Sequence, residues 1–148
     1  MELYIEKWFL EDTPLYNIKT GDEVSVLKQN DIFKKMILSG DKDYGFYYAK
    51  NGFRVGFSDN YIDEIGIDFT KSKCKVIFKT NESLFNFREK KIHKVLDFLN
   101  DNLLSWKAVE SLDNNHLMIK LNKNGIMIIF DVYKGTITNI VKSNLMSV

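Results

Sequence analysis

The sequence predicts an α+β protein made of two tandem helix-plus-antiparallel-sheet repeats, with the two sheets side by side and the helices packed on one face. The first observation behind this prediction is an internal echo: residues 15–18 (Leu-Tyr-Asn-Ile) resemble residues 84–87 (Leu-Phe-Asn-Phe), 69 positions later. The second is that each half shows helical spacing of apolar residues followed by strict alternation. Those two periods are typical of helices and of half-buried strands.

The echo continues along the chain with a slowly growing spacing. Residues 51–57 resemble residues 124–130 at a spacing of 73, and Ile62 matches Ile137 at a spacing of 75. The spacing grows only in predicted loops, which is what two copies of one folding unit would show. There is one proline and no Gly/Ser-rich linker. We therefore expect a single domain, 1–148, made of repeats at about 1–69 and 70–148.

Each repeat is predicted to begin with a strand and two helices. In the first repeat, a strand is expected over 4–9, a helix over 21–28 because residues 20–23 (Thr-Gly-Asp-Glu) have capping-box form, and a second short helix over 31–38. In the second repeat, the corresponding segments are a strand over 73–78, a helix over 88–102 with apolar residues at helical spacing, and a short helix over 103–112.

A three-stranded meander is predicted to follow the helices in each repeat. Asn51-Gly52 and Asn124-Gly125 have the composition of tight hairpin turns. The predicted strands are 44–48, 53–57, 62–69, 117–121, 126–130 and 136–141. Alternation places Phe53, Val55 and Phe57 inward, and we expect Tyr47 and Arg54 to point away from the packed side, opposite Phe46, Tyr48 and Val55.

Composition excludes several classes of function. The chain has 148 residues, 45% hydrophobic and 28% charged, with a net charge of +1. A general nucleic-acid binder carries a strong basic excess, so direct nucleic-acid binding is not expected. The charged start does not resemble a signal peptide, and no apolar run approaches membrane-spanning length. We therefore expect a cytoplasmic protein that does not associate with membranes.

Catalytic and metal-binding patterns are not expected from this sequence. A metal site needs several ligands at fixed spacing, whereas His93 and His116 fall in different halves. The single cysteine, Cys74, cannot form an internal disulfide and is interpreted as a structural residue. No phosphate-binding glycine loop is present. The sequence thus predicts a non-enzymatic protein with no cofactor and no metal.

The predicted partner-binding residues lie in and around an acidic, tyrosine-bearing segment. Acidic residues there could face the basic active site of a nucleic-acid-cleaving toxin, and tyrosine and arginine are common interface anchors. An ordinary polar sheet face remains an equally good interpretation. The candidate residues are Tyr47, Arg54, Asp59, Tyr61, Asp63, Glu64 and Asp68.

Two family resemblances follow from these segments. Residues 17–24 with 55–57 and 65–67 resemble the outer-membrane assembly lipoprotein fold, which is also the repeat unit of the beta-lactamase inhibitor protein. That resemblance implies a concave, protein-binding sheet. Residues 47–52 and 59–65 resemble the small Lys/Asn/Ile-rich immunity proteins of bacterial polymorphic-toxin and contact-dependent inhibition systems.

The second resemblance implies an immunity protein that binds one cognate toxin domain, such as a nuclease, and occludes its active site. We expect a monomer before binding. Two alternatives stay open: a structural or adaptor domain that associates through an edge strand, and a small-ligand-binding protein or enzyme with a site between the repeats. A deep pocket holding His116 or Cys74 beside a carboxylate would favour the last of these.

Overall fold

The computed structural model describes residues 2–33, 35–41, 43–49, 52–111 and 113–144. Strands account for 45% of the chain and helices for 16%. The predicted α+β class is therefore wrong: the protein is mostly β, and its helices are too few and too short to form a layer. The described helices are α1 (Glu6–Glu11), the 3₁₀ helix η1 (Val24–Gln29) and α2 (Ile92–Asp101).

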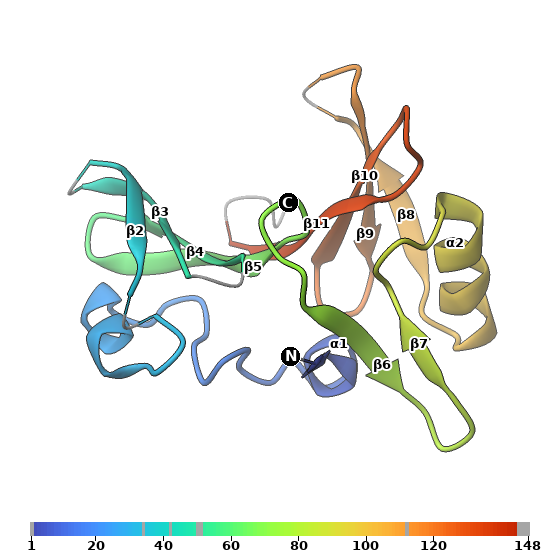
Figure 1. The fold of residues 1–148 in the computed structure, drawn as a ribbon, viewed down its shortest axis with the longest axis horizontal. Helices are drawn as coiled ribbons and strands as arrows, with labels where there is room; N and C mark the ends of the chain where they lie inside the picture. The colour runs from blue at the N-terminus through green and yellow to red at the C-terminus, as the bar shows by residue number, and fades with distance from the viewer. Residues whose placement is uncertain (1, 34, 42, 50–51, 112, 145–148) are drawn as a thin grey trace.

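One large antiparallel sheet dominates the fold (Figure 1). Its two halves are four-stranded meanders, each formed by strands consecutive in the chain, and the last strands of the two meanders pair at the centre. In spatial order the strands are β2 (Ile37–Gly40), β3 (Tyr44–Tyr48), β4 (Phe53–Ser58), β5 (Tyr61–Asp68), β11 (Ile137–Ser143), β10 (Ile126–Asp131), β9 (His116–Leu121) and β8 (Trp106–Val109).

The two meanders share their strand register. The pairing of β4 with β5 corresponds, pair by pair, to the pairing of β10 with β11, and both contain a register shift at the equivalent place. In β4 the shift lies between Gly56 and Phe57, and in β10 between Ile129 and Phe130. What the halves have in common is a meander of strands, so the predicted helix-plus-sheet unit is wrong.

The helices predicted over 31–38 and 103–112 are wrong. Part of each segment is an edge strand instead: β2 pairs with β3, and β8 pairs with β9. Segments this short are marginal as helices, whereas a neighbouring strand supplies a backbone partner at every second residue. Residues 34 and 112 of these predictions lie outside the described residues.

The N-terminal segment also differs from the prediction. The strand expected over 4–9 is instead β1 (Glu2–Tyr4) followed by α1. Trp8 and Phe9 are both buried, and adjacent residues of a strand would point to opposite faces. A helical turn lets both reach the core, with the Phe9 N–H donating to the Ile5 carbonyl at 3.0 Å.

The remaining two predicted helices begin later than expected. The capping box at residues 20–23 does not form, because η1 has no side-chain cap hydrogen bond. The helix predicted from residue 88 starts at Ile92, since Glu89 has a φ of 63°, which is incompatible with a helix. The N–H of Ile92 donates to the carbonyl of Gly135, which anchors α2 to the turn before β11.

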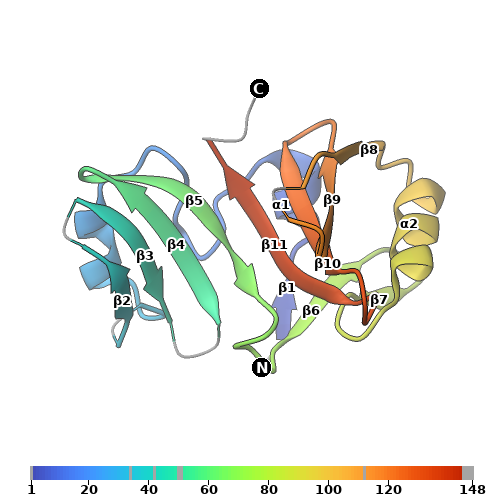
Figure 2. The same ribbon diagram turned by 90° about the horizontal axis from the view of Figure 1, so that it is seen from above.

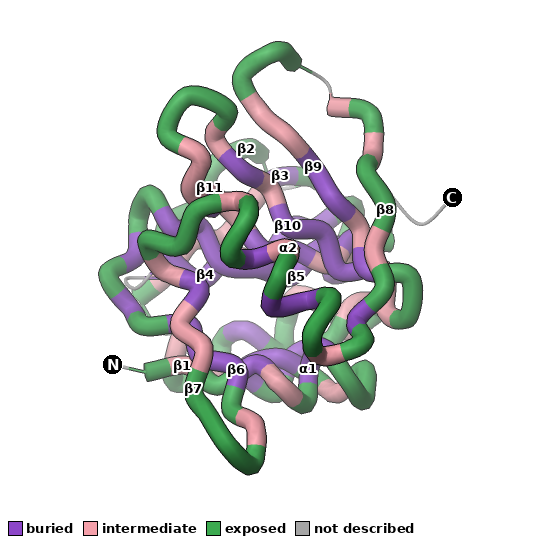
Figure 3. The backbone as a smooth tube through the Cα atoms, turned by 90° about the vertical axis from the view of Figure 1, so that its right-hand side faces the viewer, coloured by how far each residue is buried: buried purple, intermediate pink, exposed green. Residues whose placement is uncertain are grey.

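A smaller sheet and the helices cover one face of the large sheet. The small sheet consists of β1, β6 (Lys75–Lys79) and β7 (Leu84–Asn86), with β1 parallel to β6. Figure 3 shows buried stretches of the large sheet facing this lower layer. Aromatic rings fill the space between β6, β7, α1 and α2, including Phe9, Phe78, Phe85, Phe87 and Phe98. Within the described part of the chain, no helix has both the length and the apolar character needed to cross a membrane.

Candidate functional site

The backbone of the large sheet is bent, and its other face lies on the inside of the bend (Figure 1). Figure 1 shows β2–β5 and β8–β11 rising on both sides of the junction between β5 and β11, and Figure 2 looks onto this surface. No described helix lies over it. We call this surface the concave face; it is formed by Ile37, Ser39, Tyr44, Phe46, Tyr48, Arg54, Glu64, Asp68, Asn139, Val141, Ser143, Met127, Ile129, Met118, Lys120, Lys107 and Val109.

Strand register places these side chains on one face. Tyr48 lies opposite Arg54, which lies opposite Gly66, and Gly66 lies opposite Val141. Directly opposed residues of an antiparallel pair project to the same side. The row therefore crosses from one meander to the other, and continues to Met127 on β10.

An ion pair lies at the floor of the concave face. Nη2 of Arg54 donates to Oε2 of Glu64 at 2.8 Å, and their side chains are only 15% and 10% exposed. The residues directly opposite them, Gly66 and Gly56, have no side chains. A Cβ on Gly56 would lie 3.0 Å from the Phe46 ring, so the glycine lets that ring approach the guanidinium, whose carbon is 5.0 Å from the ring centroid.

The electrostatics of this pair are dominated by burial. Burial raises the pKa of the Glu64 carboxyl, and the neighbouring Asp63 charge adds to that increase. The charge and hydrogen bond of Arg54 oppose it but do not cancel it. A carboxylate in this position depends on its guanidinium partner to stay ionised.

Two polar atoms of the concave face are buried without a partner. Nε of Arg54 and Oδ1 of Asn139 have no hydrogen bond among the described residues. A buried donor or acceptor left unsatisfied costs about 1–3 kcal/mol. Both atoms are shielded from solvent, so a partner can supply the missing hydrogen bonds only if these side chains move.

Apolar walls flank the ion pair. On the β3 side, Tyr44, Phe46 and Tyr48 form an aromatic row. On the β9–β10 side, Met118 and Met127 pack with Val141 as a small cluster separate from the main core. Met118 and Met127 are themselves buried, whereas the neighbouring Val109 and Ile129 are partly exposed.

Four of the seven predicted partner-binding residues lie on or beside the concave face. Arg54 and Glu64 form its floor, as described. Asp68 is buried and accepts a hydrogen bond from the N–H of Thr70 at 2.9 Å, so it also orders the turn after β5. Asp63 accepts the Ser58 hydroxyl at 2.5 Å near the end of β4.

The other three predicted residues lie elsewhere. Tyr47, Asp59 and Tyr61 line a separate hollow of about 400 Å³ between η1 and the β4–β5 turn. Tyr47 stacks on Phe57 with ring centroids 4.9 Å apart. The structure therefore does not bring the seven residues together into one site.

The predicted orientation of Tyr47 is wrong, and the reason is register. A two-residue turn at 51–52 would pair Tyr48 with Val55, but the observed pairs are Tyr48 with Arg54 and Tyr47 with Val55. The N–H of Ala49 donates to the carbonyl of Phe53, so the loop is one residue longer. A slip of one residue moves every side chain of a strand to the other face. Tyr47 thus packs toward the core, whereas Phe46 and Tyr48 lie on the concave face. Asn51 itself lies outside the described residues.

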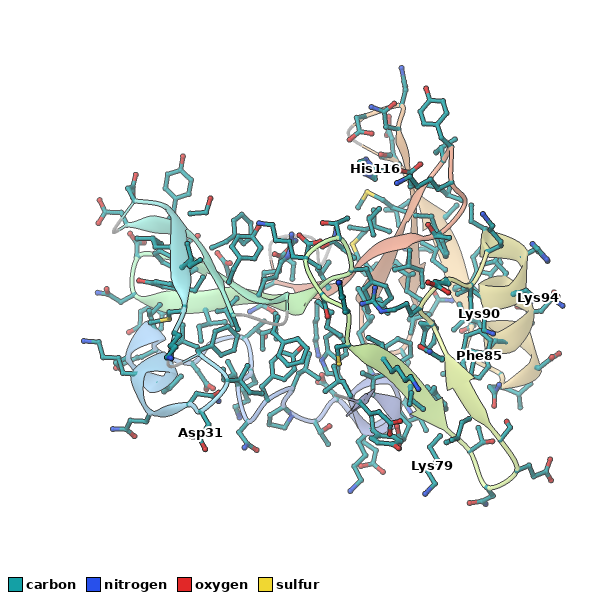
Figure 4. All side chains as sticks on the ribbon, viewed as in Figure 1. Asp31, Lys79, Phe85, Lys90, Lys94 and His116 are labelled. Atoms are coloured by element: carbon teal, nitrogen blue, oxygen red, sulfur yellow. The ribbon has the colours of Figure 1, made fainter. Side chains whose placement is uncertain are left out.

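The candidate catalytic residues make no hydrogen bond or ion pair with Arg54 or Glu64 in the described part of the chain. His116 is the half-buried first residue of β9, with Nδ1 3.0 Å from the Asp113 carboxylate (Figure 4). Cys74 is 5% exposed, and burial raises the pKa of its thiol. His93 is exposed on α2. No group of three or more His, Cys, Asp or Glu suited to a metal ion is found within the described ranges.

Comparison with known proteins assigns no family to this chain. No protein-family model matches it, and no solved structure matches it. A Protein SEY1 homolog from Plasmodium chabaudi chabaudi is 29% identical over 124 residues, which cover 80% of this chain. The matched segment is only 13% of the length of that protein, so this chain spans a small part of the relative it resembles.

Proposed function

We propose that this protein is a non-enzymatic immunity protein that binds a cognate bacterial toxin domain, such as a nuclease, through the concave face and occludes its active site. The observation that carries this proposal is the buried, partly unsatisfied polar floor between two apolar walls. Interface hot spots have this composition, with aromatic and arginine anchors surrounded by contacts that exclude water. The toxin as partner rests on the resemblance of residues 47–52 and 59–65 to immunity proteins.

The charge on the floor supports a basic partner surface. Glu64, Asp68 and Asp63 lie around Arg54 at the floor, whereas Lys107 and Lys120 lie further out, on the β8–β9 side. Burial disfavours the ionised form of Glu64. A lysine or arginine from a partner would stabilise that ionised form. Complementary charges of this kind accelerate association and select the correct partner. We propose that the complex forms in the cytoplasm, from a monomer of this protein.

Co-expression with the toxin encoded beside its gene tests this proposal. The wild-type protein should protect the cells and co-purify with the toxin in a one-to-one complex. Tyr48→Ala and Ile129→Ala, one on each wall, should abolish protection while circular dichroism shows that both variants are folded. Tyr133→Ala is the matched control, because Tyr133 is 82% exposed at the β10–β11 turn, outside the concave face. Equal protection by all three variants would overturn the proposed interface, and failure of the wild-type protein to protect would overturn the function.

A further inference from the structure

A second surface lies at the outer edge of the large sheet, along β2. All four residues of β2 are exposed, and Ile37 is 72% exposed. The strand contains no charged residue. It borders a hollow of about 520 Å³ whose walls include Lys35, Ile37, Tyr48 and Lys71.

The backbone of β2 presents unpaired groups to solvent. The N–H of Asp41 donates to the carbonyl of Tyr44, so these two residues form a hydrogen-bonded pair at the start of the β2–β3 hairpin. Hydrogen-bonded pairs alternate along an antiparallel ladder, so Ser39 and Ile37 also direct their backbone toward β3. Leu38 and Gly40 therefore direct their N–H and C=O groups outward, and an added strand can pair with them.

The side-chain chemistry beside this edge is cationic and apolar. Nζ of Lys71 lies 3.6 Å from the centroid of the Tyr48 ring. Neither Lys71 nor Lys35 has an ion pair with a carboxylate among the described residues. Ile37 and Tyr48 lie opposite each other and form the apolar part of the lining of this hollow.

We infer that β2 binds an extended acidic segment of another protein, which adds as a ninth strand to the large sheet. Main-chain hydrogen bonds to Leu38 and Gly40 provide affinity in this mode, and alternate side chains provide specificity. Side chains of the added strand that project on the same side as the concave face enter the hollow beside β2. Apolar ones contact Ile37 and Tyr48, and carboxylates pair with Lys35 and Lys71. This inference goes beyond the proposed function and does not require the Arg54–Glu64 floor.

Fluorescence anisotropy with two labelled six-residue peptides tests the inference. One peptide alternates valine and glutamate, and the other alternates valine and lysine. The wild-type protein should bind the glutamate peptide about tenfold more tightly, and added salt should reduce that difference because the lysines are exposed. The double variant Lys35→Glu/Lys71→Glu should reverse the preference. Lys123→Glu, in the distant β9–β10 turn, is the matched control and should change neither affinity.

A proline substitution tests the backbone component separately. Leu38→Pro removes an outward N–H without removing a β2–β3 hydrogen bond, and it should weaken glutamate-peptide binding at least tenfold. Leu38→Ala, which keeps the N–H, should bind within about twofold of wild type. Circular dichroism establishes that each variant is folded; if Leu38→Pro does not fold, the lysine reversal alone decides. Equal affinity for both peptides, or unchanged binding by folded Leu38→Pro, would overturn the inference. Concentration-dependent dimerisation that Leu38→Pro abolishes, without peptide binding, would overturn it in favour of a second copy as the occupant.

Discussion

Replacing Arg54 by methionine should destabilise the protein more at neutral pH than at acid pH. The substitution leaves the Glu64 carboxylate buried without its cation. Breaking a buried ion pair in this way costs about 3–5 kcal/mol. Because both side chains keep slight exposure, we expect the lower end, about 3 kcal/mol at pH 7. For a domain of this size that corresponds to a fall of about 6–12 °C in Tm.

The pH dependence follows from the direction of the Glu64 pKa. Burial raises that pKa in the folded protein, so folding favours the protonated carboxyl. The stability contributed by such a group is present at low pH and is lost as the pH rises through the folded-state pKa. Removing Arg54 raises the pKa further. The destabilisation of Arg54→Met should therefore shrink as the pH is lowered from 7 toward about 4.

The double variant Arg54→Met/Glu64→Leu removes both charges, whereas Arg54→Met leaves the Glu64 carboxylate buried without its cation. Replacing both ions by apolar side chains of similar size is often neutral or stabilising. We expect the double variant to unfold within about 1 kcal/mol of wild type at pH 7. Urea unfolding followed by circular dichroism at both pH values measures these free energies. A loss below about 1 kcal/mol for Arg54→Met at pH 7, or an equal loss at both pH values, would refute the reasoning.

Three further predictions concern close packing and burial. Gly66→Ala should lower the free energy of unfolding in urea by about 2–3 kcal/mol, because its Cβ would lie 2.5 Å from a carbonyl oxygen of β11. Gly135→Asn, at an open turn with positive φ, should lower it by under about 1 kcal/mol. Equal losses for the two variants would contradict this prediction. Phe53→Ala should cost about 3–5 kcal/mol, since the ring is fully buried and stacks on Tyr16 at 4.2 Å, and a loss near zero would show that this stack is absent in solution. The Cys74 thiol should react slowly with a disulfide reagent in the folded protein and rapidly in guanidinium, because burial both shields it and raises its pKa; rapid labelling without denaturant would exclude a buried thiol.

Local alternation and turn residues were sufficient to predict most of the central strands. The segments 44–48, 53–57, 126–130 and 117–121 agree with β3, β4, β10 and β9 to within a residue or so. Each has a clear apolar alternation or a glycine turn beside it. In these segments local preference and tertiary environment favour the same structure.

The edge strands could not be predicted in the same way. Residues 31–38 and 103–112 contain short apolar runs whose spacing fits either a helix or a strand. What makes β2 and β8 strands is the free edge of β3 and β9, which is a feature of the assembled sheet. The α+β prediction failed because both of these segments were assigned as helices.

Sequence predicted the acidic and arginine residues of the concave-face floor but missed its walls. Arg54 and Glu64 stand out by charge in a predicted strand. Met118 and Met127 have the same periodicity as core residues, and nothing local shows that they lie on the opposite face. Their position beside the first meander depends on the pairing of β5 with β11, which joins segments about 75 residues apart. Phe46 and Tyr48 were assigned to the wrong face by a one-residue error in hairpin register.

Isothermal titration of the cognate toxin domain with the wild-type protein and with Arg54→Met/Glu64→Leu tests the central claim most directly. The double variant keeps the fold but removes the polar floor of the concave face. The account predicts one-to-one binding by the wild-type protein and at least a hundredfold higher Kd for the double variant, about 2.7 kcal/mol. Equal Kd values for the two proteins, with both folded, would contradict the claim that the concave face is the binding surface.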